Sequence, residues 1–167
     1  MRNVGLLVGY QAIWWSAILG AGAGRPWIGV VVAAALIPAW WMLSGQFGAE
    51  ALLSAAAAGL GWTLDALASA TGALGFPEAA RLGEPAPLWM VAMWVGFAAL
   101  LSGPLAWLNR RPAVAALCGA AGGPLAYEAG SCLGAVELGP NAWLVIAAEW
   151  AVATPVLGWI AGRGGAR

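Results

Sequence analysis

The sequence predicts an all-α integral membrane protein, built as one bundle of about six transmembrane helices. Hydrophobic residues make up 62% of the chain and charged residues only 8%, whereas soluble domains carry about 25% charged residues. Six apolar segments follow one another with short links, and each approaches the roughly 20 residues that a membrane-spanning helix needs. Most of the tryptophans lie near the ends of these segments, as in the aromatic belts of membrane proteins.

The predicted spans form a single domain and cover residues 4–22, 26–43, 50–76, 87–108, 112–136 and 141–161. Pro26, Pro87 and Pro112 open the second, fourth and fifth spans, at a helical position where the missing N–H group costs nothing. Asn141 is suited to cap the sixth span. The first span has an alternative interpretation, because Arg2, the apolar stretch and Ala21-Gly22-Ala23 resemble a secretory signal peptide; we expect it to be retained.

The third and fifth spans are defined less sharply by composition. The Gly- and Ala-rich stretch from Ser69 to Gly75 leaves the end of the third span open. In the fifth span, Gly122, Ala126, Gly130 and Gly134 recur every four residues, and small residues let helix backbones approach in a membrane. We therefore expect the fifth span to be central in the bundle.

Prolines also fall inside the predicted spans, at Pro38, Pro104, Pro124 and Pro155. Each removes one backbone donor and frees the carbonyl group four residues earlier. In lipid that carbonyl must find another partner. These positions are either packing kinks or local openings that admit a polar side chain or a ligand.

Arginine and tryptophan predict the orientation. Both termini and two links share one side with Arg2, Arg110, Arg111, Arg163 and Arg167, and only Arg25 and Arg81 fall on the other side. This excess predicts that both termini are cytoplasmic. Seven of the twelve tryptophans lie at predicted span ends: Trp27, Trp89 and Trp143 at outer ends, and Trp40, Trp41, Trp107 and Trp159 at inner ends.

The candidate site is built on three acids inside spans, Asp65, Glu128 and Glu149, with no basic residue in any span. An ionisable residue within the membrane is costly and indicates a functional site. Helical rise places Asp65 about 16 Å, and the other two about 12 Å, from the outer ends of their spans, so the three are expected to form one layer. Either these acids are protonated and hydrogen-bonded, or a cation or cationic ligand completes the site.

Four further residues at neighbouring depths complete the predicted ligand-binding set: Tyr127, Gln11, Trp62 and Trp150. The chain has no histidine, which removes the usual haem ligand, general base and zinc ligand. Phosphate-binding loops and metal-ligand clusters are also missing, so the sequence predicts no cofactor, no metal site and no catalytic residue. With a formal charge of zero and no basic run, nucleic acid is excluded as a partner.

Several motifs resemble a bacterial family of small inner-membrane proteins that carries only a domain-of-unknown-function label. They are Gly61-Trp62-Thr63-Leu64-Asp65, Ala86-Pro87-Leu88-Trp89 with Trp94, Leu105-Ala106-Trp107-Leu108, and residues 119–134 around Gly-Gly-Pro-Leu-Ala-Tyr. Genes of that family often neighbour genes for cyclopropane fatty acid synthases. The resemblance implies an inner-membrane location and a lipid-related context, and it carries over no catalytic residue.

Three functions are compatible with these features. The first is binding or transport of a lipid or small amphiphile through the acidic layer. The second is an accessory subunit of a larger membrane complex, since short links leave little for soluble chemistry. The third is an intramembrane enzyme that modifies lipids. Membrane lipids, and in the second case other membrane subunits, are the expected partners.

Overall fold

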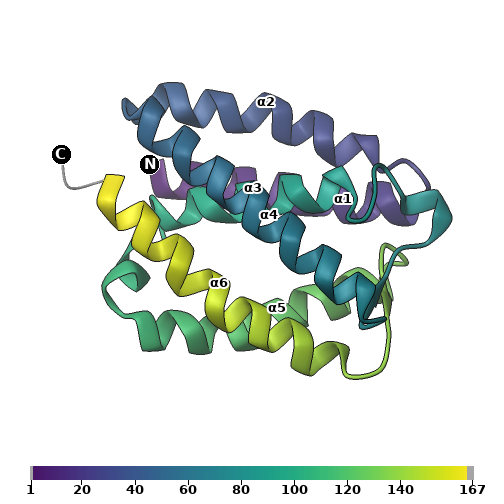
Figure 1. Cartoon of the computed structure of the whole chain (residues 1–167). Helices are drawn as coiled ribbons and strands as arrows, with labels where there is room; N and C mark the ends of the chain where they lie inside the picture. The colour runs from purple at the N-terminus through teal and green to yellow at the C-terminus, as the bar shows by residue number, and fades with distance from the viewer. Residues whose placement is uncertain (1, 165–167) are drawn as a thin grey trace.

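A computed structural model describes residues 2–164 of the chain, and six α-helices make up most of this part (Figure 1). They are α1 (Arg2–Gly22), α2 (Trp27–Ser44), α3 (Phe47–Ala70), α4 (Leu88–Leu101), α5 (Pro112–Cys132) and α6 (Ala142–Gly164). Two short 3-10 helices, η1 (Glu78–Ala80) and η2 (Ala106–Arg110), and two short strands, β1 (Leu74–Gly75) and β2 (Glu137–Leu138), lie in the links. The predicted all-α bundle is confirmed.

Four of the six helices have the length and composition of membrane spans. Helices α1, α2, α3 and α6 are long and apolar enough to cross a membrane, and α4 is a shorter apolar helix of 14 residues. A helix of that length rises only about 21 Å, less than the roughly 30 Å of hydrocarbon in a bilayer. The chain after α4 therefore covers the remaining depth through a turn and η2.

Three helices end earlier than predicted, and the reason differs between them. Helix α3 ends at Ala70 rather than at residue 76, and α5 at Cys132 rather than at 136, each followed by a glycine with positive φ, Gly72 and Gly134. Such backbone angles are open to glycine and break an α-helix. Helix α4 ends at Leu101 rather than at 108, because the ring of Pro104 cannot continue the helix.

The other three prolines lie inside helices as predicted: Pro38 in α2, Pro124 in α5 and Pro155 in α6.

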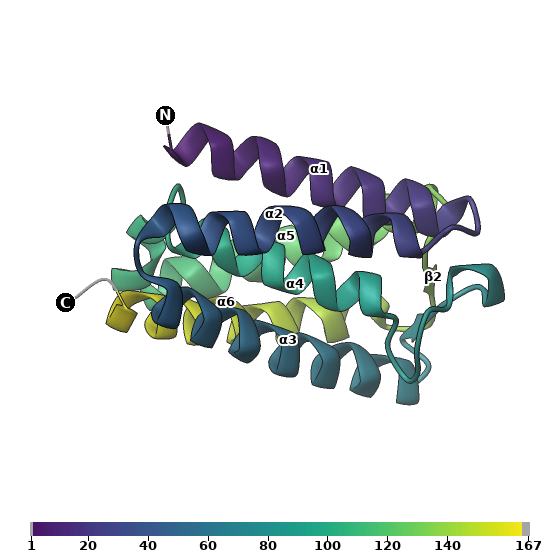
Figure 2. The ribbon, with the colours of Figure 1, turned by 90° about the horizontal axis from the view of Figure 1, so that it is seen from above.

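Helix α4 is the centre of the bundle, and α5 is not. Figure 2 shows α4 between its neighbours, and it packs against α1, α2, α3 and α6. Its buried residues include Trp89, Met90, Trp94 and Leu101, as expected of a helix that is apolar all round. Helix α5 packs mainly on α6. The prediction that the fifth span is central is wrong.

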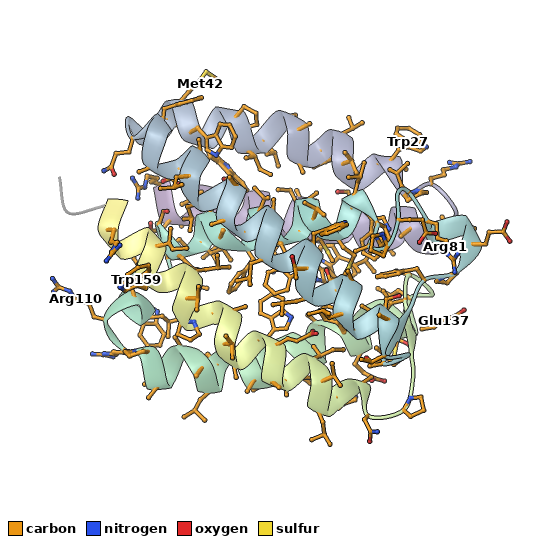
Figure 3. The ribbon with its side chains drawn as sticks, viewed as in Figure 1. Trp27, Met42, Arg81, Arg110, Glu137 and Trp159 are labelled. Atoms are coloured by element: carbon orange, nitrogen blue, oxygen red, sulfur yellow. The ribbon has the colours of Figure 1, made fainter. Side chains whose placement is uncertain are left out.

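The chain ends share one end of the bundle. The start of α1 and the end of α6 lie together, in what we call the terminal end (Figure 1). The links after α1, α3 and α5 lie at the opposite end, which holds β1 and β2 and is called the sheet end. In Figure 3, Met42, Arg110 and Trp159 lie at the terminal end, and Trp27, Arg81 and Glu137 at the sheet end. The chain thus crosses the bundle an even number of times.

A small cap closes the sheet end. Strands β1 and β2 pair antiparallel, with Leu74 opposite Leu138 and Gly75 opposite Glu137. Beneath them Trp89 is fully buried and donates from Nε1 to the carbonyl oxygen of Ala80 at 2.8 Å. Trp89 was expected in an aromatic belt and instead fills the core.

Four other tryptophans from the predicted belts are about half exposed: Trp27, Trp107, Trp143 and Trp159.

Candidate functional site

Asp65 is the centre of the site. It lies on α3, five residues before the helix ends, and its side chain is fully buried. One turn earlier, Gly61 is packed so closely against α4 that a Cβ atom there would overlap the ring of Trp94. The absence of a side chain at Gly61 therefore lets the Trp94 indole approach the backbone of α3 beside Asp65.

Both oxygens of the Asp65 carboxyl group accept hydrogen bonds from side chains. Trp94 on α4 donates from Nε1 to Oδ2 at 2.8 Å. The hydroxyl group of Tyr127 on α5 donates to Oδ1. Since an unpaired buried polar group is costly, the two donors explain how an acid can sit in an apolar interior without a basic partner. We call these three side chains the Asp65 network.

A stack of aromatic rings supports the network. Trp150 on α6 lies parallel to Trp94, with ring centroids 4.2 Å apart and an interplanar angle of 17°. Phe97 meets Trp150 edge-on, with centroids 5.0 Å apart. On the other side Gly123 of α5 makes room, because a Cβ atom there would overlap the Trp150 ring. Helices α3, α4, α5 and α6 thus converge on one carboxyl group.

A second acid lies close to the network. Glu149 on α6 is partly buried and directly precedes Trp150 of the aromatic stack. Its Oε2 atom is buried and finds no hydrogen-bond partner among residues 2–164. The Nε1 atom of Trp150 is likewise without a partner in this part of the chain, although it lies beside the Tyr127 hydroxyl. The site therefore holds one carboxyl oxygen without a donor among the described residues.

An apolar pocket adjoins the network between α1, α4 and α5. The room inside it is small, about 30 Å³, enough for one or two water molecules, and the pocket is open to the surroundings on one side. Because α5 packs mainly on α6, the backbones of α5 and α1 are not packed closely together, and side chains line the space between them. The pocket is lined by Tyr10, Trp14, Ile18, Met90, Met93, Trp94, Ala126, Tyr127, Gly130, Val136 and Trp150. Asp65 itself lies behind Trp94 and Tyr127.

The structure gathers four of the seven predicted site residues: Asp65, Glu149, Tyr127 and Trp150. The other three lie elsewhere, and the predicted single layer of three acids does not form around Asp65.

Helical geometry explains why these three are apart. Glu128 follows Tyr127 by one residue, hence by 100° around the helix, and it accepts a hydrogen bond from Trp143 at 3.0 Å on an exposed face. Trp62 is 41% exposed and stands 100° from the buried Gly61. Gln11 is exposed on α1.

Trp94 and Phe97 belong to the site but were not predicted as site residues. A usable signal for Trp94 was present, because Gly61 lies one turn before Asp65 and small residues mark the close approach of another helix. A buried indole N–H also needs an acceptor. Nothing in the sequence distinguishes Phe97 from its apolar neighbours.

The site combines a few polar groups with an apolar surface. Residues 2–164 contain no group of three side chains that could hold a metal ion. The network offers a fixed carboxyl group, a tyrosine hydroxyl and an indole donor, and the adjoining pocket offers apolar surface. Such an arrangement is suited to a molecule with a polar and an apolar part.

These features define the class of the protein: an all-α integral membrane bundle with a hydrogen-bonded carboxyl group in its interior. A family model described as a protein of unknown function (DUF2878) matches residues 3–156. The chain belongs to this family, and the match includes the whole Asp65 network. No curated protein matches the chain, and no solved structure does.

The match confirms the part of the predicted resemblance that assigns the chain to a family of unknown function. The bacterial origin and the neighbouring fatty-acid genes stay predictions.

Proposed function

We propose that the protein binds a lipid or a small amphiphile over the open side of the pocket between α1, α4 and α5. One observation carries the proposal: a fully buried carboxyl group, held by two donors, stands directly behind the wall of an apolar pocket. An isolated acid would be expensive in this interior. The two hydrogen bonds of the Asp65 network offset part of the free energy of burying the acid. They also hold polar groups at a defined place beside the apolar surface.

The pocket lining suits an apolar chain with a polar head. Met90 and Met93 line one wall, and methionine side chains adapt to irregular apolar groups. The hydroxyl groups of Tyr10 and Tyr127 belong to lining residues and provide hydrogen-bonding groups. Transport, as opposed to binding, would require the ligand to leave on a second side.

The same proposal places the protein in the bacterial inner membrane with both termini in the cytoplasm. Its support is the charge distribution, because four arginines of the described residues lie at the terminal end and only Arg25 and Arg81 at the sheet end. Basic residues accumulate on the cytoplasmic side of membrane proteins. The accessory-subunit and lipid-modifying-enzyme hypotheses stay predictions, without a geometric observation of this kind.

The proposal is tested by filling the pocket. Ala126 lines it from α5, whereas Ala121 is exposed on the same helix. We expect Ala126→Phe to lose the amphiphiles that copurify with the parent protein, because the added ring occupies their space. Ala121→Phe is the matched control and is expected to retain them. Mass spectrometry of lipid extracts from purified protein measures the difference.

Either of two results would overturn the proposal. If Ala126→Phe folds and keeps the same bound species at the same stoichiometry as the parent, the pocket does not hold them. Parent protein that carries no species beyond the bulk lipid composition would have the same consequence.

A further inference from the structure

A second hollow lies at the terminal end, separate from the pocket beside Asp65. It is a groove between the turn joining α2 to α3 and the last turns of α6, with a volume of about 770 Å³. Gly45 to Ala49 form one lip, and Trp159 to Gly164 form the other. The groove continues along α3 past Leu52 and Ala56, so its floor is apolar over more than two helical turns.

The groove forms because α3 and α6 touch only at some levels along its length. At the end of α6, Gly164 lies so close to Ala49 that an added Cβ atom would stand 2.8 Å from the alanine side chain. Deeper in the bundle, Leu53 and Leu157 are buried in a common core cluster. Between these levels the large side chain of Leu52 is 66% exposed and so is left without a protein neighbour over most of its surface.

The mouth of the groove carries a positive charge. The guanidinium group of Arg163 lies 3.5 Å from the ring centre of Trp159, a cation–π contact that holds it over the groove. Trp159 lies at the terminal end of the bundle, as Figure 3 shows. Tryptophan favours the depth of lipid head groups. The Arg163–Trp159 pair therefore marks the level at which a lipid phosphate would lie.

This charge is not neutralised within the described residues. The ion pair found in residues 2–164 joins Arg81 to Glu84 at the opposite end. The acid nearest the groove along α3, Glu50, accepts a hydrogen bond from Ser102 at 3.1 Å and lies within the field of Arg2. Within residues 2–164, the Arg163 guanidinium thus has no acidic partner and can bind an anion.

We propose that this groove holds one anionic phospholipid, with its phosphate on Arg163 and an acyl chain along Leu52, Ala56 and Ile160. Arginine binds phosphate through a fixed fork of N–H groups, and the apolar floor selects a ligand with a chain over a small soluble anion. The proposal rests on the membrane location of the bundle and not on the ligand of the pocket beside Asp65. The groove would be a second lipid site, at the outer surface of the bundle, that selects lipids by the negative charge of their head group.

The test counts lipids on the purified protein in nanodiscs of equal parts phosphatidylglycerol and phosphatidylcholine, by native mass spectrometry. We expect the parent to retain one phosphatidylglycerol in preference to phosphatidylcholine, and Arg163→Gln to lose that preference roughly fivefold, the effect of one arginine near an anionic lipid surface. Arg111→Gln is the matched control, since Arg111 also lies over a tryptophan, Trp107, at 5.7 Å but outside the groove.

A groove-filling variant, Ala56→Phe, separates a seated lipid from an anion bound at the surface. It leaves Arg163 in place, and we expect it to lose the retained phosphatidylglycerol as well. Equal preference in the parent and Arg163→Gln would overturn the proposal. So would retention in Ala56→Phe, or full displacement of the lipid by inorganic phosphate, because either result would mean that the charge alone binds.

Discussion

At the scale of single residues, the buried carboxyl group of Asp65 is stabilised by two neutral hydrogen-bond donors instead of a basic side chain. Asp65 is fully buried, and its oxygens accept from Trp94 and Tyr127. Hydrogen bonds to a charged or polarised carboxyl group contribute more than neutral pairs. The geometry depends on Gly61, since any side chain there would displace the Trp94 ring.

Removal of the Tyr127 hydroxyl group is the direct test of this network. We expect Tyr127→Phe to lower the free energy of unfolding by about 1–2 kcal/mol, because one oxygen of a buried carboxyl group loses its donor. Thermal unfolding of purified protein in detergent measures the change. Tyr10→Phe, which removes a hydroxyl group from the same pocket without touching Asp65, is the control and should change stability much less.

A double-mutant cycle shows whether the effect passes through Asp65. The loss from Tyr127→Phe should shrink when Asp65→Asn is already present, with a coupling of about 1 kcal/mol between the two positions. Additive losses would mean that the hydroxyl group and the carboxyl group act independently, contrary to the network described.

The sequence identified part of this site for a physical reason. An acid such as Asp65 in an apolar segment is conspicuous by its cost, and Tyr127 lies at a compatible depth. Depth alone, however, cannot give the direction in which a side chain points. Glu128 was predicted to share a layer with Asp65 on the basis of depth alone. It follows Tyr127 by one residue on the helix, however, so its side chain lies on the exposed face beside Trp143.

At the scale of elements, the most extensive packing between two helices joins α5 to α6. A Cβ atom at Gly119 would overlap the carbonyl oxygen of Trp150 and the hydroxyl group of Thr154, and one at Gly123 would overlap the Trp150 ring. These glycines bring α5 near enough for Tyr127 to reach Asp65. The sequence indicated a stripe of small residues in this helix but placed it along Gly122 and Gly130, which is offset from the face that α6 contacts.

This offset gives a paired prediction. We expect Gly119→Ala to destabilise the protein by about 1–3 kcal/mol, the usual cost of overpacking a close contact. Gly122→Ala should be within about 0.5 kcal/mol of the parent, because nothing lies within 4 Å of its Cβ position. Unfolding midpoints of the two variants, compared side by side, measure the difference. Equal stability would contradict the packing of α5 on α6.

The early end of α4 shows the limit of hydropathy as a guide to helix ends. The stretch Leu105-Ala106-Trp107-Leu108 is as apolar as the helix before it and was predicted to belong to the same span. Pro104 ends the helix at Leu101, and Asn109 then donates from Nδ2 to the Leu101 carbonyl oxygen at 2.9 Å. The Leu101 carbonyl group at the end of the helix thus finds its partner in η2, and a hydropathy scale contains no information on such a hydrogen bond.

At the scale of the whole molecule, the number of helices was predictable and their arrangement was not. Membrane thickness sets the length of each apolar segment, so counting segments counts helices. Lipid is as apolar as the bundle interior, so apolarity does not distinguish α4 in the centre from α2 at the edge. The central position of α4 follows instead from contacts between helices far apart in the sequence.

The arrangement of the ends leads to a prediction about orientation. Glu84 at the sheet end and Gln46 at the terminal end are both exposed. Loss of the exposed Arg81–Glu84 ion pair should cost little. With Cys118 and Cys132 replaced by alanine, since both are exposed, Glu84→Cys should react with a membrane-impermeant maleimide in intact cells. Gln46→Cys should react only after the membrane is opened, because the arginine-rich terminal end faces the cytoplasm. The reverse pattern would invert the orientation, and equal labelling of both in intact cells would contradict a bundle that places them on opposite sides.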